Sequence, residues 1–364
     1  MRLRVKNKIL LLVIFIFISL DPPGVAQQYE PETSLAPNDR QDKLFLRSIE
    51  YVYQDSFSAA YAVLDTMINE YPDYWPANVF KIGVLFTEMN DSESKSKADQ
   101  FHALIDTTEK GIEEYLKKYP DDKWAHFFKG IAMGYWALYE GNHGSWLKAI
   151  FKGLAAGKHY SKAIELDSTF YEAYLGLGSL NYWRSAKLGI ARKLPFIPDR
   201  REEGIRQIKL AIDSSRYSSL PAQTGLAWIY YNKKEYRKAL HLMNDLMNRG
   251  YRGRQVLWPR GLAYFKIGNS KGVIACFSKI KDGLELQGNQ NYYNIGLCNY
   301  YLGLAHYWSG KYATSLSYLN ALLDQPVDKD VAKRLKQKYD RAEHYKDIIK
   351  DAVAERAKRR QGTF

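Results

Sequence analysis

The stretch at residues 220–253 reads LPAQTGLAWIYYNKKEYRKALHLMNDLMNRGYRG. Its two halves carry small and apolar side chains at a spacing of three or four, which marks one buried face of a helix. These positions are Leu226, Ala227, Tyr230, Ala239 and Met243. A polar turn, Asn-Lys-Lys-Glu, separates the halves. The stretch therefore predicts two helices that fold back on each other as a hairpin.

The same arrangement recurs along the chain. A small residue stands among large apolar ones at Gly83, Gly130, Gly178, Ala227, Gly261 and Gly303. A recurrence at this interval is typical of stacked supersecondary units that share one continuous core. Alternating β-branched strand patterns are essentially absent. The sequence predicts an all-α chain of about seven helical hairpins and a closing helix.

Two motifs sharpen this prediction. Tyr174, Leu177 and Gly178 have the spacing W-x-x-L-G with Tyr in place of Trp, and the stretch from Val79 to Phe86 fills the longer pattern W-x-x-L-G-x-x-Y with apolar residues. Several second helices end at a Pro that cannot continue them, as in Tyr71-Pro72-Asp73. Over residues 41–330 the chain resembles the tetratricopeptide repeat family. The resemblance implies a right-handed superhelical solenoid that binds a partner along its concave face.

The chain departs from the family pattern in places. His306 and Asn181 stand where the family usually has an aromatic residue, and three central units exceed the usual length of 34 residues. These departures leave the hairpin architecture intact and leave the repeat boundaries open.

The N-terminus predicts export. Four basic residues precede an apolar run from Ile9 to Leu20, and the small triplet Gly24-Val25-Ala26 follows. This order is typical of a secretory signal cleaved after Ala26, and the apolar run is shorter than the roughly 20 residues that span a bilayer. We expect a signal peptide at 1–26, a flexible leader at 27–40, the repeats at 41–330 and a basic capping helix and tail at 331–364. The expected location is the bacterial periplasm.

The charge is concentrated at the C-terminus. The whole chain has a formal net charge of +13, and residues 329–360 hold twelve basic residues against six acidic ones. Apolar residues recur there at helical spacing, which indicates a helix with one buried and one solvated basic face. Its end could touch anionic lipid or an acidic partner, giving at most peripheral membrane contact. We expect no nucleic-acid partner.

The sequence contains none of the common metal-binding, redox or phosphate-binding motifs. No H-E-x-x-H pair, C-x-x-C pair or phosphate-binding loop occurs, so no metal, cofactor or catalytic residue is predicted. His126, His143 and His159 are close enough in sequence for a shared site, but ordinary packed or exposed histidines are the favoured explanation. Cys276 and Cys298 lie in adjacent predicted helices and form either a disulfide or two buried thiols.

The candidate binding residues are mostly aromatic. In a tetratricopeptide-like solenoid the first helix of each unit lines the concave face, so its rings divide between the packing seam and the groove. The rings placed toward the inside are Trp124, Phe127, Tyr135, Tyr182, Trp183, Trp228, Tyr231, Trp258, Phe265, Tyr300, Tyr307 and Trp308. Tyr and Trp combine large contact area with a polar group, as peptide-binding grooves require.

An insertion at residues 184–201 is a second candidate. It mixes apolar residues with six basic ones, and insertions in repeat proteins often carry binding. Arg192, Lys193, Arg200 and Arg201 are the residues expected to meet an acidic or carboxylate-bearing partner.

Three classes of function remain open. The first is a noncatalytic exported scaffold or adaptor that binds a protein or peptide in the aromatic groove. The second is a small-ligand-binding accessory of a transport system, which a deep pocket near Trp124, Tyr182 and Trp183 would favour. The third is an enzyme acting on envelope polymers, and the sequence supplies no convergent titratable groups for it.

Overall fold

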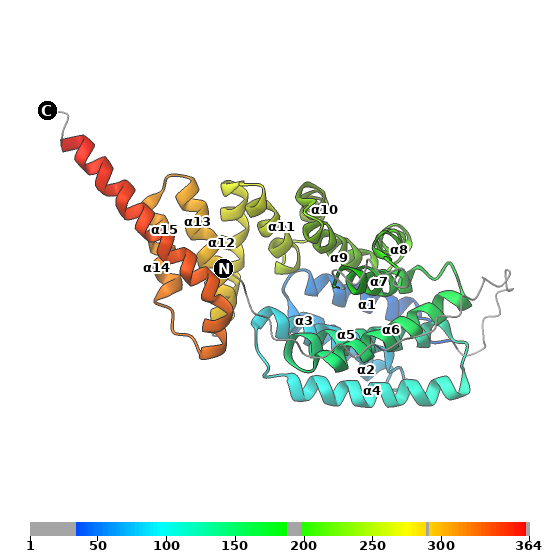
Figure 1. The fold of residues 1–364 in the computed structure, drawn as a ribbon. Coiled ribbons are helices and arrows are strands. Elements are labelled where there is room, and N and C mark those ends of the chain that lie inside the picture. Colours follow the sequence, from blue (N-terminus) through cyan, green and yellow to red (C-terminus); the bar gives the residue numbers. More distant parts are fainter. Residues whose placement is uncertain (1–33, 188–197, 289–290, 362–364) are drawn as a thin grey trace. The chain divides into compact units, whose positions relative to one another are not determined.

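A computed structural model describes residues 34–187, 198–288 and 291–361, and this part of the chain is helical without any strand (Figure 1). The described helices belong to one compact unit, Ser34–Phe364. The helices are α1 (Asp39–Val52), α2 (Phe57–Glu70), α3 (Pro76–Ser92), α4 (Ala98–Lys118), α5 (Lys123–His143), α6 (Trp146–Leu166), η1 (Tyr171–Ala173, a 3-10 turn), α7 (Tyr174–Lys187), α8 (Arg201–Ser214), α9 (Ser219–Asn232), α10 (Tyr236–Asn248), α11 (Arg254–Lys266), α12 (Ser270–Leu286), α13 (Tyr292–Trp308), α14 (Tyr312–Leu323) and α15 (Lys329–Gln361).

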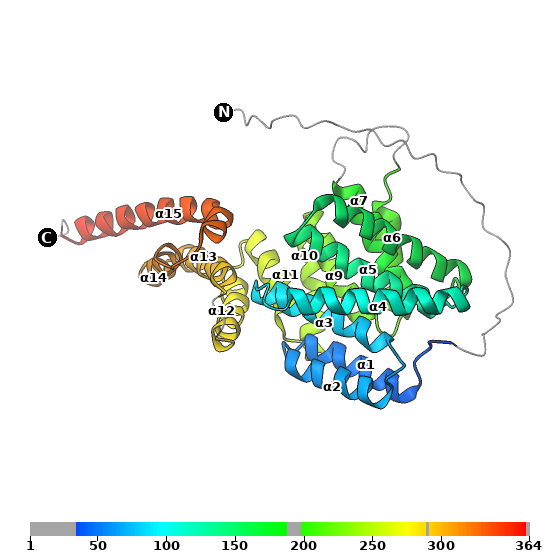
Figure 2. The ribbon, with the colours of Figure 1, turned by 90° about the horizontal axis from the view of Figure 1, so that it is seen from below.

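Helices that follow one another in the chain pack against one another. They form seven hairpins, from α1–α2 to α13–α14, and α15 then packs on α13 and α14. Figure 2 shows the same succession from below. The predicted all-α solenoid of about seven hairpins with a closing helix is therefore confirmed.

Side-chain caps set several helix starts. Asn38 accepts hydrogen bonds from the backbone of Arg40 and Gln41 and forms a capping box, which starts α1 at Asp39. The Asp122 carboxylate caps α5 in the same way and also accepts the N–H of Leu35 at 3.0 Å. Leu35 is buried. The last residues of the predicted leader 27–40 are thus held by the first units of the stack.

In two of the three long central units, the extra residues lie in the helices. The helices α4, α5 and α6 each contain 21 residues, against 14 in α1 and α2. In the third long unit, α7 and α8 have 14 residues each, and the predicted insertion at 184–201 overlaps the end of α7 at Lys187 and the start of α8 at Arg201.

The recurring small residues allow helices to approach closely. A Cβ placed on Gly178 in α7 would lie 2.7 Å from the backbone carbonyl oxygen of Gly204 in α8. The two backbones are in direct contact here, so no side chain can move aside to make room.

The first three helices also contact units far along the chain. Arg254 at the start of α11 donates from Nε and Nη2 to the carboxylate of Asp91 in α3 at 2.7–3.0 Å, and its Nη1 lies 3.2 Å from Asp55. The Arg254 and Asp91 side chains are only 4% and 2% exposed. Asn291 and Asn294 donate to the backbone carbonyl of Asp91.

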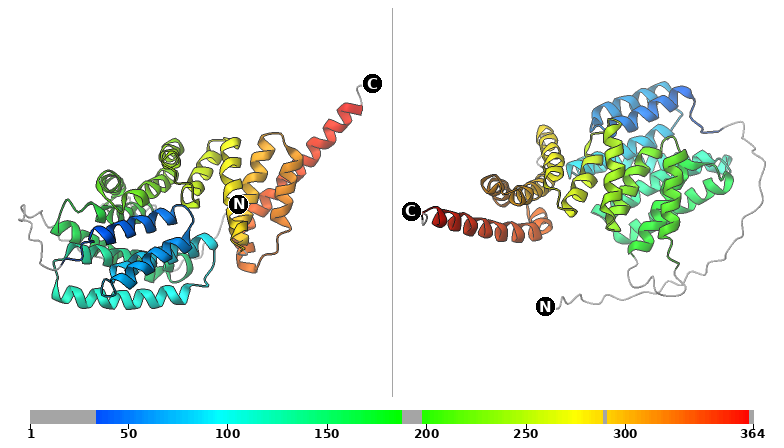
Figure 3. Two further views of the ribbon diagram at one scale, coloured as in Figure 1. Left: turned by 180° about the vertical axis from the view of Figure 1, so that it is seen from behind. Right: turned by 90° about the horizontal axis from the view of Figure 1, so that it is seen from above.

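Further contacts join the end of α1 to later units, and we call this set of long-range contacts the closure. The backbone N–H of Gly253 donates to the carbonyl of Tyr53 at 2.9 Å, and the Tyr53 hydroxyl is 2.8 Å from Thr224 Oγ1 in α9. Views from behind and above show the blue α1 close to the yellow-green helices (Figure 3). The C-terminal ends of α1 and α3 are therefore held against later units of the same chain.

Within residues 34–187, 198–288 and 291–361, no helix combines the length and the apolar run that a bilayer requires. The predicted signal peptide lies outside the described residues.

Gly178→Ala is expected to destabilise the protein, because its new methyl group would push α7 and α8 apart. We expect a loss of about 1–3 kcal/mol in the free energy of unfolding, measured by urea denaturation. Gly225→Ala in α9 is the matched control, since its Cβ would meet only an ordinary contact 3.7 Å away. That control should gain up to about 1 kcal/mol from higher helix propensity. Equal effects of the two substitutions would contradict the close approach at Gly178.

Arg254→Met is expected to cost about 3–5 kcal/mol in the free energy of unfolding, because it leaves the buried Asp91 carboxylate without its partner. The double variant Arg254→Met with Asp91→Leu should regain part of that loss. Arg334→Met, which removes a partly exposed ion pair with Glu93, is the control and should have a much smaller effect. A small effect of Arg254→Met alone would show that the closure does not depend on this pair.

Candidate functional site

Three of the predicted groove residues belong to the core. Phe127, Tyr182 and Tyr300 are at most 2% exposed. The Tyr182 hydroxyl donates to Asn232 Oδ1 at 2.8 Å, which satisfies its polar group inside the stack. Their rings stabilise the fold and offer no free face in this structure.

The other predicted rings are more accessible. Eight of them are half-buried: Trp124, Tyr135, Trp183, Trp228, Tyr231, Trp258, Phe265 and Tyr307. Of the twelve predicted rings, Trp308 at the end of α13 is the only one with an exposed side chain, at 40%. The ring surface available to a partner is thus greatest in the last units.

Trp308 belongs to an aromatic–cation cluster. We define it as Phe265 and Lys266 of α11, Tyr300 and Trp308 of α13, and Lys338 and Arg341 of α15. The Phe265 ring centroid lies 4.9 Å from that of Trp308 and 6.4 Å from that of Tyr300. Lys338 Nζ lies 5.2 Å from the centre of the Tyr300 ring, and Arg341 Nη1 donates to the Tyr300 hydroxyl at 3.5 Å. The cluster joins three helices at the C-terminal end of the stack.

The cluster carries excess positive charge. Burial lowers the pKa of Lys338, and the positive charges of Arg341 and Lys266 lower it further. The three cations therefore act on one another in one small region, where an incoming carboxylate would relieve their repulsion. Lys266 and Arg341 are exposed, so their charged groups are accessible to such a carboxylate.

The sequence predicted the rings of this cluster but missed its cations. Lys338 and Arg341 are three residues apart on α15, which places them on one face of a helix. That spacing was visible in the sequence. Their position beside Tyr300 depends on how α15 packs on α13 and could not be read from the spacing.

The predicted basic insertion is only partly described. Arg192 and Lys193 lie outside the described residues. Arg201 forms an ion pair with Asp199 at 2.6 Å, and Arg200 lies 3.8 Å from Glu203. Both arginines therefore have local carboxylate partners at the start of α8.

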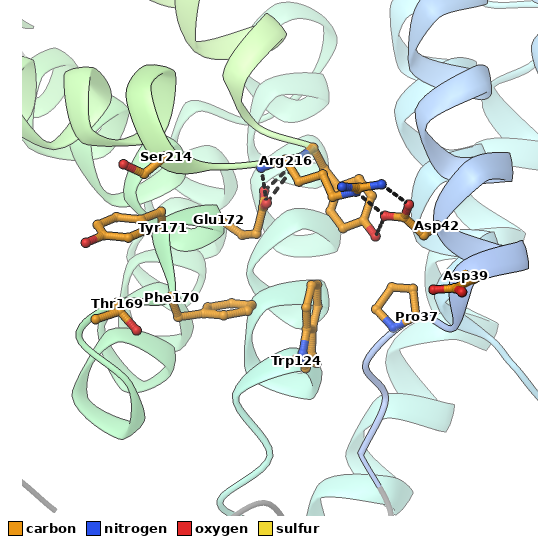
Figure 4. A pocket seen from close by; sticks show the side chains of 11 residues that line it. Pro37, Asp39, Asp42, Trp124, Thr169, Phe170, Tyr171, Glu172, Ser214 and Arg216 are labelled. Atoms are coloured by element: carbon orange, nitrogen blue, oxygen red, sulfur yellow. Dashed lines mark hydrogen bonds and ion pairs between the residues drawn. The ribbon is translucent and has the colours of Figure 1, made fainter. Parts of the chain in front are cut away.

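A cleft lies beside Trp124. It is an open cleft of about 460 Å³ between the start of α1, η1 and the α8–α9 connection (Figure 4). The residues that line it are Pro37, Asp39, Asp42, Trp124, Thr169, Phe170, Tyr171, Glu172, Ser214, Arg216 and Tyr217. Trp124 meets Phe170 edge to face, with ring centroids 4.7 Å apart. Trp124 is the only predicted site residue in this lining.

The charged groups of this cleft already serve the fold. Asp42 pairs with Arg216 and accepts the Tyr217 hydroxyl at 2.6 Å. Burial opposes its ionisation, but these hydrogen bonds lower the pKa of Asp42 overall. The pKa of Glu172 is raised, because burial disfavours its charged form. The backbone N–H groups of Arg216, Tyr217 and Ser218 donate to the carboxylate and offset part of this rise. Both carboxylates fasten the α8–α9 connection to its neighbours.

Two of the three grouped histidines meet. His126 of α5 and His159 of α6 have Nδ1 atoms 2.9 Å apart, and His126 Nε2 lies 2.8 Å from the carbonyl oxygen of Pro120. The carbonyl requires a proton on His126 Nε2, so in the neutral pair His159 Nδ1 donates to His126 Nδ1. His143 instead packs near Tyr139. In the described part of the chain, no three His, Cys, Asp or Glu side chains are grouped to hold a metal ion.

The two cysteines are both buried free thiols. Arg260 Nη1 lies 3.4 Å from Cys276 Sγ. Burial raises the pKa of both thiols, which disfavours the reactive thiolate. The sequence left open a disulfide or two buried thiols, and the structure contains two buried thiols.

The helices define the chain as an all-α helical-repeat protein. No protein-family model matches it, and no curated protein is similar to it in sequence. Among solved structures, it is similar to a tetratricopeptide repeat protein from Parabacteroides merdae ATCC 43184. The identity is 13%, the match covers 83% of this chain and 99% of that one, and the TM-score is 0.38. The assignment to the all-α helical-repeat class rests on the packing of this chain's own helices.

The histidine pair predicts a pH dependence of stability. Burial, together with the charge of Lys129, lowers the pKa of His159 to about 4. The unfolded chain therefore binds a proton more readily than the folded one, and stability is lost as the pH falls from about 6.5 toward 4. His159 is only half-buried and solvent screens part of this effect, so we expect it to contribute a loss of about 1 kcal/mol between pH 7 and pH 5.

Urea denaturation at the two pH values tests this contribution. His159→Gln keeps a side chain able to hydrogen-bond His126 and should reduce the loss. His241 is exposed, so His241→Gln should leave the wild-type pH dependence in place. The same loss in His159→Gln and wild type would contradict the assignment.

Proposed function

We propose that the chain is a noncatalytic, tetratricopeptide-like scaffold that binds an acidic, extended segment of a partner protein at the aromatic–cation cluster. The exposed ring of Trp308 carries this proposal. An apolar or aromatic side chain of the partner would cover Trp308 beside Phe265. Neighbouring carboxylates would pair with Lys266, Lys338 and Arg341.

The chemistry of the cluster supports a peptide ligand. Trp and Arg are the residue types that most often dominate binding energy at protein interfaces. A ring at 40% exposure keeps part of its surface in water, and covering that surface is favourable. The surrounding cations would select acidic segments over neutral ones, mainly by raising the rate of encounter.

The proposed place of action is the bacterial periplasm, after cleavage following Ala26. The basic residues, apolar run and small triplet of residues 1–26 support this location. The partner would then be another protein of the cell envelope. No cofactor, metal or nucleic acid is part of the proposal.

A small-ligand accessory of a transport system is the second candidate. The cleft beside Trp124 has a volume in the range of ligand sites, about 300–1,000 Å³, and an aromatic wall. It is open, however, and Tyr182 and Trp183 do not line it. A metabolite that raises the melting temperature of wild type but not of Trp124→Leu would favour this candidate over the scaffold.

Capture from a detergent-solubilised envelope extract tests the scaffold proposal. Residues 27–364 should retain a specific protein, identified by mass spectrometry. The double variant Trp308→Ser with Arg341→Gln should bind that protein at least about tenfold more weakly, because it removes a ring and a charge from the proposed contact.

The fold should survive these changes because both side chains are exposed. Leu286→Ser is the matched control, since Leu286 is 88% exposed and lies outside the cluster. The control should bind like wild type. A partner held equally well by the double variant would rule out the cluster as its binding site.

A further inference from the structure

An exposed apolar face covers the first half of α6. Trp146, Leu147 and Phe151 are 62–66% exposed, and Ile150 and Leu154 are 41–42% exposed. Leu138, at the end of α5, is 54% exposed. These six are the majority of the eleven exposed large apolar side chains in the described residues. Single exposed apolar residues are ordinary, whereas a concentration on one helix face marks an interaction surface.

The fold leaves this apolar face of α6 unburied. The five α6 residues stand at positions i, i+1, i+4, i+5 and i+8, which is one side of a helix. The inward side of this half carries Ala149, Gly153 and Ala156, which are half-buried or buried as α6 packs on α5 and α7 (Figure 2). The helix thus has a core side of mostly small residues and an outward side of large apolar ones.

The same helix is strongly basic. Residues 146–164 contain Lys148, Lys152, Lys158 and Lys162 and no acidic residue. Lys152 stacks on Trp136 and lies 3.7 Å from Glu109, and Lys162 lies near Asp121 and Glu165. Lys148 and Lys158 are exposed, and neither forms an ion pair in the part of the chain that the structure describes. The apolar face is therefore accompanied by unpaired positive charge.

This combination fits a lipid surface better than a protein. The apolar side chains project outward, so a protein partner would need a groove shaped to receive them. A second copy meeting the same face would bring lysines against lysines, because a two-fold contact uses the same patch twice. A bilayer needs no matching shape, and its anionic headgroups complement the lysines.

We propose that α6 lies in the surface of an anionic membrane. Trp146, Ile150 and Phe151 would enter the boundary between headgroups and acyl chains, and Lys148 and Lys158 would meet lipid phosphates. This contact is independent of the aromatic–cation cluster, which uses α11, α13 and α15. It would hold the scaffold at a membrane while that cluster binds its partner.

Vesicle flotation tests this proposal with residues 34–364, the compact unit that contains the described helices. Wild type should float with vesicles of phosphatidylglycerol and phosphatidylethanolamine and much less with phosphatidylcholine vesicles. Trp146→Ser with Phe151→Ser should weaken this partition about tenfold or more. Lys148→Gln with Lys158→Gln should weaken it about fivefold per lysine, and added salt should reduce wild-type binding.

The control is Ile267→Ser with Leu286→Ser, which removes two exposed apolar side chains elsewhere and should partition like wild type. Circular dichroism and melting temperature verify that every variant is folded. Three results would overturn the proposal: no flotation of wild type, equal flotation with both vesicle types, or undiminished flotation of Trp146→Ser with Phe151→Ser. A dimer in solution that the same two substitutions dissociate would also overturn it, because the face would then join two copies.

Discussion

The buried ion pair between Arg254 and Asp91 is the constraint on which the arrangement of the hairpins depends. Both side chains are almost fully removed from water, which is costly for isolated charges and acceptable only when their hydrogen bonds are made. Those bonds form only when the start of α11 meets the end of α3 and the turn between α1 and α2. The pair therefore favours one placement of the later units on the first ones.

This closure decides which surfaces remain for binding. The C-terminal ends of α1 and α3 contact the chain's own later units, through Tyr53 with Thr224 and Asp91 with Asn291 and Asn294. Rings that would line a groove in an open stack, such as Tyr182, instead complete the core. The exposed aromatic surface is left near Trp308, beside the basic face of α15.

The two proposed surfaces would bind through different kinds of interaction. The aromatic–cation cluster combines a few fixed rings with charges from α11 and α15, which suits recognition of one kind of segment. The outward face of α6 has large apolar residues and lysines on a single helix, which suits a surface without defined shape. A scaffold with both would hold a partner at a membrane by separate contacts.

The sequence by itself determined the helices and their pairing. Spacing at three or four residues, caps such as Asn38 and close-packing glycines such as Gly178 are local signals, and each acts between neighbouring segments. Rings such as Phe127 and Trp308 could be placed on first helices, but their exposure could not be foreseen. That exposure depends on contacts between different helices and turns, such as Phe127 with Phe170 and Trp308 with Phe265. The contact of Arg254 with Asp91, 163 positions apart, belongs to the same kind. Only the tertiary structure decided them, because no local pattern records which distant helix end will supply the partner of a buried charge.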